Sequence, residues 1–94
     1  MITSKERAFL KGKLALKKAD FRIGKEGLKE ETIEAMDLYL KKNEILKIQF
    51  LNNAELEPME VFHQLEEALG VEFLMQLGHV LGVYRDSERH LYLK

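Results

Sequence analysis

The fold is decided around residues 20–28, which read Asp20-Phe21-Arg22-Ile23-Gly24-Lys25-Glu26-Gly27-Leu28. The first four residues alternate between polar and apolar side chains, which is typical of a short β-strand. Gly24 and Gly27 then bracket a turn, because glycine lets the backbone bend and lets a neighbouring molecule approach closely. This stretch therefore predicts a strand that runs into a GxxG loop.

Three helices are predicted around this strand, at residues 4–16, 30–42 and 58–69. Thr3 and Glu6 have the spacing of a capping box, in which each side chain satisfies an unpaired amide at the start of a helix. Apolar residues recur at helical spacing in the other two segments, at Ile33, Met36 and Leu40 and at Phe62, Leu65 and Leu69.

Three more strands are predicted at residues 45–51, 71–77 and 80–84, from their apolar and β-favouring composition and the turn residues between them. The order αβαβαββ predicts a single α/β domain of the α+β type, in which three helices pack on a four-stranded mixed sheet in one layer or two. A further strand-like segment at residues 91–93 either extends this sheet or stays outside it.

The composition is that of an ordinary folded domain. The chain has 94 residues, of which 46% are hydrophobic and 33% charged, and this suits one compact domain. It has no cysteine, which excludes disulfides, thiolate metal clusters and thiol chemistry. The amino terminus is charged and no apolar run could span a bilayer, so we expect a cytoplasmic protein without membrane association.

The charge is distributed unevenly along the chain. Residues 1–29 hold nine Lys or Arg against three acids, a net charge of +6, whereas residues 30–94 hold six against thirteen, a net charge of -7. In the first helix, Arg7, Lys11 and Lys18 fall within one narrow sector if the helix extends that far. This pattern indicates a basic face that meets phosphate or an acidic surface, or else lysines that merely solubilise an exposed helix.

The GxxG loop is the sharpest local feature. Its glycines and the amides at the start of the following helix suit a phosphate, although many such loops are only connecting turns. No Gly-Lys-Ser/Thr follows at Walker spacing, and the third glycine of a dinucleotide fingerprint is absent. Nucleotide chemistry is therefore not expected.

No residues suggest catalysis or metal binding. His63, His79 and His90 lack the spacing of metal ligands, and the two serines have no base near them in sequence. Paired glutamates such as those at residues 30–31 and 66–67 read as solvated helix faces rather than as a general acid and base. We therefore expect a protein that is not an enzyme and needs no cofactor or metal.

Four ordered pieces of the chain resemble one family. They are Leu10 to Gly12, Ile23 to Leu28, Glu44 to Ile48 and Leu77 to Arg85. Together they make the chain similar to a stand-alone CRM domain, the chloroplast RNA splicing and ribosome maturation module, of the bacterial and archaeal YhbY type. The resemblance covers nearly the whole chain, and it implies a fold related to the carboxy-terminal domain of bacterial translation initiation factor three.

The same resemblance implies that the chain binds RNA, that the GxxG loop meets the RNA backbone, and that basic residues of the first helix extend this surface. The candidate RNA-binding residues are Gly24, Lys25, Glu26, Gly27, Lys29, Arg7, Lys11, Lys18, Arg22 and Arg85. The sequence departs from the family pattern at Ala19, Lys29 and His79, and at Glu26, which places a negative charge beside the expected phosphate.

The leading hypothesis is therefore a monomeric RNA-binding protein that holds ribosomal RNA of the large-subunit precursor and assists assembly of that subunit. The alternative is a protein-interaction module whose acidic second half docks on a ribosomal protein or an assembly factor. Salt dependence separates the two, because phosphate contacts weaken steeply with salt whereas an apolar docking surface does not.

Overall fold

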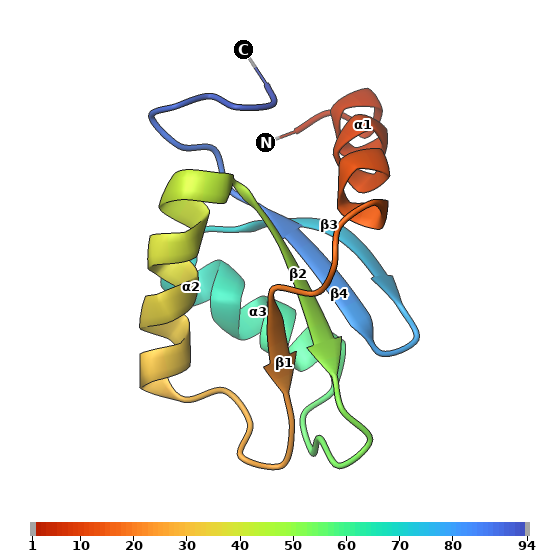
Figure 1. Cartoon of the computed structure of the whole chain (residues 1–94), viewed down its shortest axis with the longest axis vertical. Helices are drawn as coiled ribbons and strands as arrows, with labels where there is room; N and C mark the ends of the chain where they lie inside the picture. The colour runs from red at the N-terminus through yellow and green to blue at the C-terminus, as the bar shows by residue number, and fades with distance from the viewer. Residues whose placement is uncertain (1, 94) are drawn as a thin grey trace.

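The computed structural model describes residues 2–93 and contains three helices and four strands in the predicted order (Figure 1). In chain order they are α1 (Ser4–Ala15), β1 (Phe21–Ile23), α2 (Glu30–Asn43), β2 (Ile45–Phe50), α3 (Pro58–Leu69), β3 (Glu72–Leu77) and β4 (Val80–Tyr84). The αβαβαββ prediction is confirmed, and the predicted boundaries differ from these by at most a residue. None of the helices within residues 2–93 has the length and apolar character needed to cross a membrane.

The four strands form one mixed sheet in the order β1-β2-β4-β3. β1 pairs in parallel with β2, and the other two pairs are antiparallel. Ile23 lies opposite Phe50 at one end of β2, and Tyr84 lies opposite Ile45 at the other end. The GxxG loop and the end of β4 are therefore at opposite ends of the sheet.

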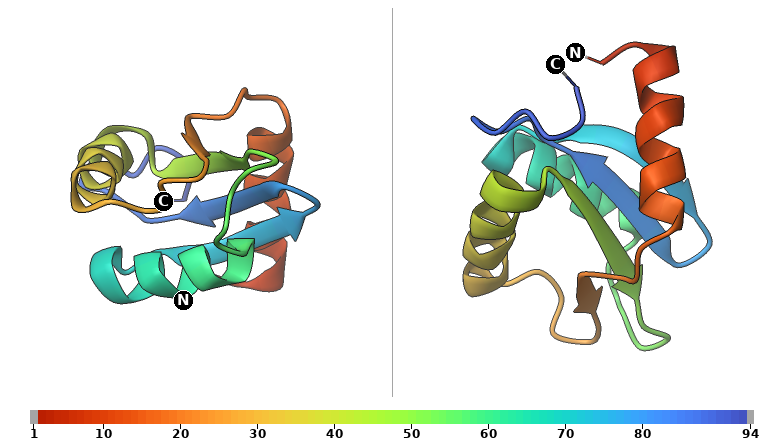
Figure 2. Two further views of the ribbon diagram at one scale, coloured as in Figure 1. Left: turned by 90° about the horizontal axis from the view of Figure 1, so that it is seen from below. Right: turned by 45° about the horizontal axis from the view of Figure 1, so that its top comes forward.

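Helices cover both faces of the sheet, which settles the open choice between one helical layer and two. α1 lies alone on one face, and α2 and α3 lie on the other (Figure 2). Successive residues of a strand point to opposite faces, so Leu46 packs in the larger cluster under α2 and α3 while Ile45 packs in the smaller cluster under α1.

Gly82 of β4 allows α1 to approach the sheet closely. A Cβ atom placed on this glycine would lie 2.2 Å from Leu14 Cδ2 and 3.2 Å from Met75 Cγ. Leu14 and Leu10 are both buried in the smaller cluster. The docking of α1 therefore depends on the missing side chain at residue 82.

The ends of the helices explain their boundaries. Thr3 and Glu6 form the predicted capping box, in which Thr3 Oγ1 accepts from the Glu6 amide and Glu6 Oε1 accepts from the Thr3 amide. α3 begins with Pro58, whose fixed φ suits the first helical position, and ends at Gly70 with φ +70°.

A buried carboxylate organises the segment after β4. Glu44, which follows α2, is 0% exposed and has a φ of +67°. Its carboxylate accepts hydrogen bonds from Ser87 Oγ at 2.6 Å and from the Leu91 amide at 3.0 Å. Residues 91–93 are not a strand; Tyr92 and Leu93 instead pack against the cluster under α1. This segment therefore stays outside the sheet, which settles the second open alternative.

Candidate nucleic-acid interface

The GxxG loop is a tight turn with its two central side chains at the tip. The Gly27 amide donates to the Gly24 carbonyl at 3.1 Å, and Gly27 has a φ of +71°, a conformation that other residues rarely adopt. Lys25 and Glu26 are exposed between the glycines. The turn therefore presents one cation and one anion to solvent.

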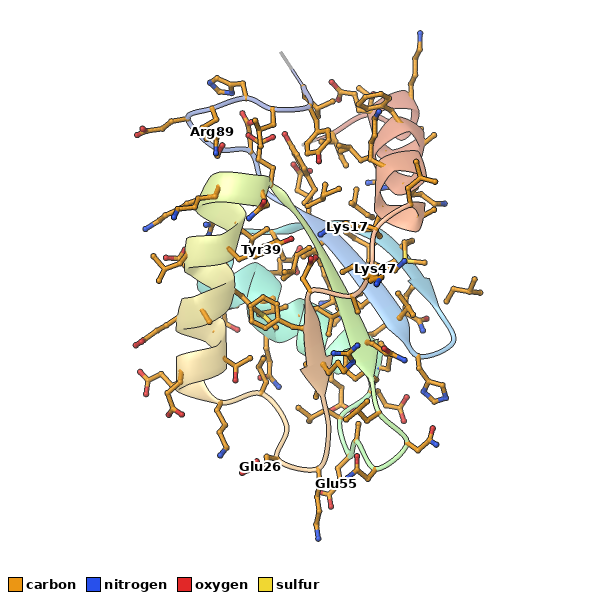
Figure 3. All side chains as sticks on the ribbon, viewed as in Figure 1. Lys17, Glu26, Tyr39, Lys47, Glu55 and Arg89 are labelled. Atoms are coloured by element: carbon orange, nitrogen blue, oxygen red, sulfur yellow. The ribbon has the colours of Figure 1, made fainter. Side chains whose placement is uncertain are left out.

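Both glycines also let the loop pack on its neighbour, the segment at residues 51–56 between β2 and α3. A Cβ atom at Gly24 would lie 3.2 Å from Asn53 Oδ1, and one at Gly27 would lie 3.3 Å from Leu56 Cδ1. Figure 3 shows Glu55 of this segment at the same end of the molecule as Glu26. The surface beside the loop is therefore of mixed charge, which the net charge of residues 1–29 did not suggest.

An ion pair within the loop region joins Glu26 to Lys29. Lys29 Nζ lies 2.6 Å from Glu26 Oε1, and both side chains are exposed. The hydrogen bond and the positive charge of Lys29 lower the pKa of the Glu26 carboxyl, and the same contact raises the pKa of Lys29. Glu26 thus offsets the charge of Lys29, and Lys25 is left as the uncompensated cation of the loop.

α2 begins at the residue predicted from the sequence. The helix begins at Glu30, so Leu28 and Lys29 separate it from the glycines, and its amino-terminal cap makes no side-chain hydrogen bond. Glu30 and Glu31 occupy the first turn, where acidic side chains favour the helix dipole but repel phosphate. The acidic first turn opposes phosphate binding at these amides, and a contact between them and a phosphate stays a prediction.

Lys18 and Arg22 lie on the chain immediately before the loop. Phe21 and Ile23 pack against α2 and α3, so the alternation of β1 turns Arg22 to the face on which α1 lies. α1 ends at Ala15, so Lys18 belongs to the linker and does not continue the helical sector of Arg7 and Lys11. Both side chains are exposed and make no hydrogen bond or ion pair with residues 2–93.

A polar network holds the linker between α1 and β1 in place, and no sequence pattern indicated it. The Asp20 carboxylate accepts from the Tyr39 hydroxyl at 2.5 Å and from the Lys47 amide at 2.8 Å, and it forms an ion pair with Lys17. Lys47 Nζ in turn donates to the Lys17 carbonyl at 3.0 Å, near the end of α1 (Figure 3). Burial, together with the Asp20 charge, raises the pKa of Tyr39.

This network has two consequences for the basic face. Lys17 and Lys47 are held by internal contacts, so their charges are already balanced or committed to backbone carbonyls. The linker that carries Lys18 is anchored at both ends, so that residue emerges from a fixed backbone. The count of charges along the sequence treated Lys17 like the lysines beside it. In the structure, however, its ammonium group is already paired with Asp20.

Arg7 and Lys11 lie apart from the loop. Arg7 Nε donates to the Phe73 carbonyl at 3.0 Å, on β3, which is the edge strand opposite β1. Lys11 is exposed one helical turn further along the same flank of α1. The structure therefore does not bring these two residues together with the GxxG loop.

Arg85 is also held away from the loop. Its guanidinium pairs with Asp37 Oδ1 at 2.8 Å and donates to the carbonyls of Asp37 and Leu69. It follows Tyr84, at the end of β4 that lies opposite the start of β2. Arg85 therefore links α2 to the end of α3 and stabilises the fold.

The candidates that the structure does gather are Lys18, Arg22, Lys25 and Lys29, together with Gly24, Glu26 and Gly27; we call them the β1-edge surface. They follow one another from the linker through β1 to the loop at the outer edge of the sheet. Elsewhere, His63, His79 and His90 are exposed, and the described residues hold no group of three or more His, Cys, Asp or Glu arranged for a metal ion.

Known proteins resemble this chain over most of its length. A family model described as the CRS1/YhbY (CRM) domain matches residues 2–85. "Probable RNA-binding protein YqeI" of Bacillus subtilis (strain 168) is 24% identical over 90 residues, which cover 96% of this chain and 94% of that protein. The solution structure of hypothetical protein SAV1595 from Staphylococcus aureus, described as "a putative RNA binding protein", is 28% identical with a TM-score of 0.81, covering 100% of this chain and 98% of the other.

Proposed function

Because the chain belongs to the CRS1/YhbY (CRM) domain family, we propose that it binds RNA through the sugar–phosphate backbone at the β1-edge surface. The relatives described above carry RNA binding in their names, which supports RNA as the ligand class. We further propose ribosomal RNA of the large-subunit precursor as the target, on the resemblance of the sequence to YhbY-type proteins. In this proposal the protein acts in the cytoplasm as a monomer and assists assembly of that subunit without catalysis.

One observation carries the proposal: three cations without internal partners lie in sequence beside a glycine loop that a phosphate can approach. Lys18, Arg22 and Lys25 are exposed and make no ion pair with residues 2–93. Phosphate oxygens are the group that Lys and Arg side chains contact most in nucleic-acid complexes. Side chains that are not engaged internally can form such contacts without first breaking an internal ion pair.

This mode of binding predicts low sequence specificity and a defined salt dependence. Backbone contacts position a protein on a nucleic acid but carry no direct sequence information. Three phosphate contacts on single-stranded RNA should give a slope of roughly -2 in a plot of log affinity against log salt concentration. RNAs of different sequence should therefore bind with similar affinity and similar slope.

The test compares two charge-matched variants by fluorescence anisotropy with labelled RNA. Replacing Lys18, Arg22 and Lys25 together by Gln should abolish most of the binding and most of the salt slope. The control replaces Lys41, Lys42 and Arg89 by Gln, which removes the same charge at the end of α2 and in the segment after β4. Equal losses in both variants would contradict a localised surface, and crosslinking in cells with sequencing of the attached RNA tests the ribosomal target.

A second candidate function has one observation in its favour. Residues 48–84 contain no Lys or Arg and six acids. A shallow groove between α2 and α3 is lined by Ile33, Leu38, Ala68 and Leu69, and Leu38 is 63% exposed. An acidic, partly apolar surface of this kind suits a basic protein partner such as a ribosomal protein. Binding that persists at high salt and is lost in Leu38→Asp, while RNA binding is unchanged, would support this function.

A further inference from the structure

We propose that Phe9 on α1 is a stacking platform for an unpaired nucleobase, so that the protein prefers single-stranded over fully paired RNA. The proposal rests on the RNA-binding function proposed above. The candidate RNA-binding residues of α1 named so far, Arg7 and Lys11, would contact phosphate, whereas Phe9 would contact a base. An aromatic ring can stack on any base, so this contact favours unstacked RNA without selecting a sequence.

Exposure sets Phe9 apart from every other aromatic residue. The chain has five Phe and three Tyr, all within the described residues, and seven of these rings are buried or half-buried in the core. Phe9 is 47% exposed, on a helix whose apolar contacts to the sheet come from Leu10 and Leu14 instead. The folding of α1 therefore does not explain an aromatic ring at residue 9.

One cation lies over the Phe9 ring, and a second lysine is one helical turn away on the same side of α1. Lys13 Nζ lies 5.4 Å from the centroid of the Phe9 ring. Lys5 and Lys13 are each four residues from Phe9, so all three side chains lie on one stripe of the helix. A nucleotide combines a flat aromatic base with a phosphate, and this stripe offers an aromatic face between two ammonium groups.

The stripe lies on the side of α1 away from Arg7. At about 100° per residue, Phe9 is roughly 160° around the helix from Arg7, and Lys13 is roughly 120° from it. Arg7 reaches the Phe73 carbonyl on β3, whereas Lys47 of β2 donates to the Leu14 carbonyl, so α1 crosses the sheet from β3 toward β2. In Figure 1 the segment after α1 leads from this helix to β1. An RNA strand that continues from the β1-edge surface along this segment therefore reaches the carboxy-terminal end of α1, within two helical turns of Phe9.

The experiment compares single-stranded and duplex RNA oligonucleotides with Phe9 variants by fluorescence anisotropy. Phe9→Ala should weaken binding to the single strand about fivefold or more, as expected for loss of one stacked base, and should leave the salt slope and the duplex affinity unchanged. Phe9→Trp should keep the affinity, and its fluorescence should be quenched by the single strand. Since the chain has no Trp, that signal reports residue 9 alone.

Leu16→Ala is the matched control. Leu16 is 87% exposed and apolar and caps the end of α1, seven residues after Phe9, but it has no aromatic face. Its substitution should leave RNA binding unchanged, and equal unfolding midpoints in urea will show that both variants remain folded.

The outcomes separate this proposal from the one on which it rests. If Lys25→Ala weakens RNA binding while Phe9→Ala binds single strands like the wild type, stacking at Phe9 is wrong and RNA binding through the loop stands. If Phe9→Trp shows no quenching by RNA that it binds, or if Phe9→Ala weakens duplex binding equally, stacking is also wrong. If the wild type binds no RNA at all, both proposals fail.

Discussion

Replacing Gly82 by Ala should destabilise the protein by forcing α1 away from the sheet. The added Cβ would lie 2.2 Å from Leu14 Cδ2, whereas carbon atoms in ordinary contact are about 3.5–4.0 Å apart. The Leu14 side chain or the helix must therefore move by about 1.3 Å or more. Leu14 is buried, so its side chain has little free space to occupy, and Met75 Cγ would lie 3.2 Å from the same Cβ.

The magnitude follows from two opposing effects. Overpacking a filled core costs about 1–3 kcal/mol. Exchanging glycine for alanine within a strand recovers about 0.5–1 kcal/mol, because it restricts the unfolded chain. The free energy of unfolding should therefore fall by roughly 1–2 kcal/mol.

The assay is urea unfolding followed by circular dichroism, in two backgrounds. Leu14→Ala removes the clashing Cδ2 atom and by itself should cost about 2–5 kcal/mol, as a buried leucine truncation does. In that background Gly82→Ala should cost nothing or should stabilise slightly. The coupling energy of the double-mutant cycle should thus be about 1–3 kcal/mol.

The same loss of stability from Gly82→Ala in both backgrounds would refute this reasoning. It would mean that the cost comes from the backbone of β4 and not from Leu14. No loss in the wild-type background would show instead that α1 shifts over the sheet without penalty.

Three further predictions concern charge. Lys25→Ala should weaken the binding of RNAs of different sequence to a similar degree and reduce the salt slope by about one, measured by anisotropy across a salt series; selective loss for one sequence would point to base readout. Glu26→Gln should raise RNA affinity roughly three- to tenfold at low salt, because it removes a charge like that of phosphate and frees Lys29 from its ion pair; unchanged affinity would place the RNA elsewhere. Arg85 lowers the pKa of Asp37 below its usual 3.8, so Asp37 stabilises the fold above that pH and this stabilisation is lost as pH falls through the folded-state value. Asp37→Asn should therefore be less stable than the wild type at pH 7 in thermal unfolding, with a gap that closes in acid; a constant gap would contradict this.

Local sequence patterns were sufficient to predict the order of the elements. The capping box at Thr3 and Glu6, the glycines around β1 and Pro58 at the start of α3 each act within a few residues, so their effect can be read directly. The open questions, whether helices cover one face or two and whether residues 91–93 join the sheet, depend on long-range contacts. Gly82 lets α1 pack on the sheet, and the buried Glu44 carboxylate holds the segment after β4. Neither role can be predicted from the residues next to it in the sequence.

The candidate site was predicted less completely, for a related reason. Counting charges along the sequence treats every lysine alike, whereas the fold commits Arg7, Lys17 and Arg85 to internal partners. Those partners are 66, 3 and 48 residues away in the chain, so only the shortest of these pairings could have been inferred from spacing. The residues that stay uncommitted, including Lys18 and Lys25, are close to one another in sequence, and their contact with RNA stays a prediction.

The position of α1 has a consequence for the order in which the protein can fold during synthesis. This helix leaves the ribosome before the strands on which it packs, which are β3, β4 and β2, and the first two of these are made after the other two strands. Until residues 72–84 emerge, Leu10 and Leu14 have only part of the surface that buries them, and α1 alone is too short to be a stable helix in water. The lysine-rich amino-terminal segment is therefore an unanchored chain for most of translation, and it becomes a rigid helix only when the final hairpin closes beneath it.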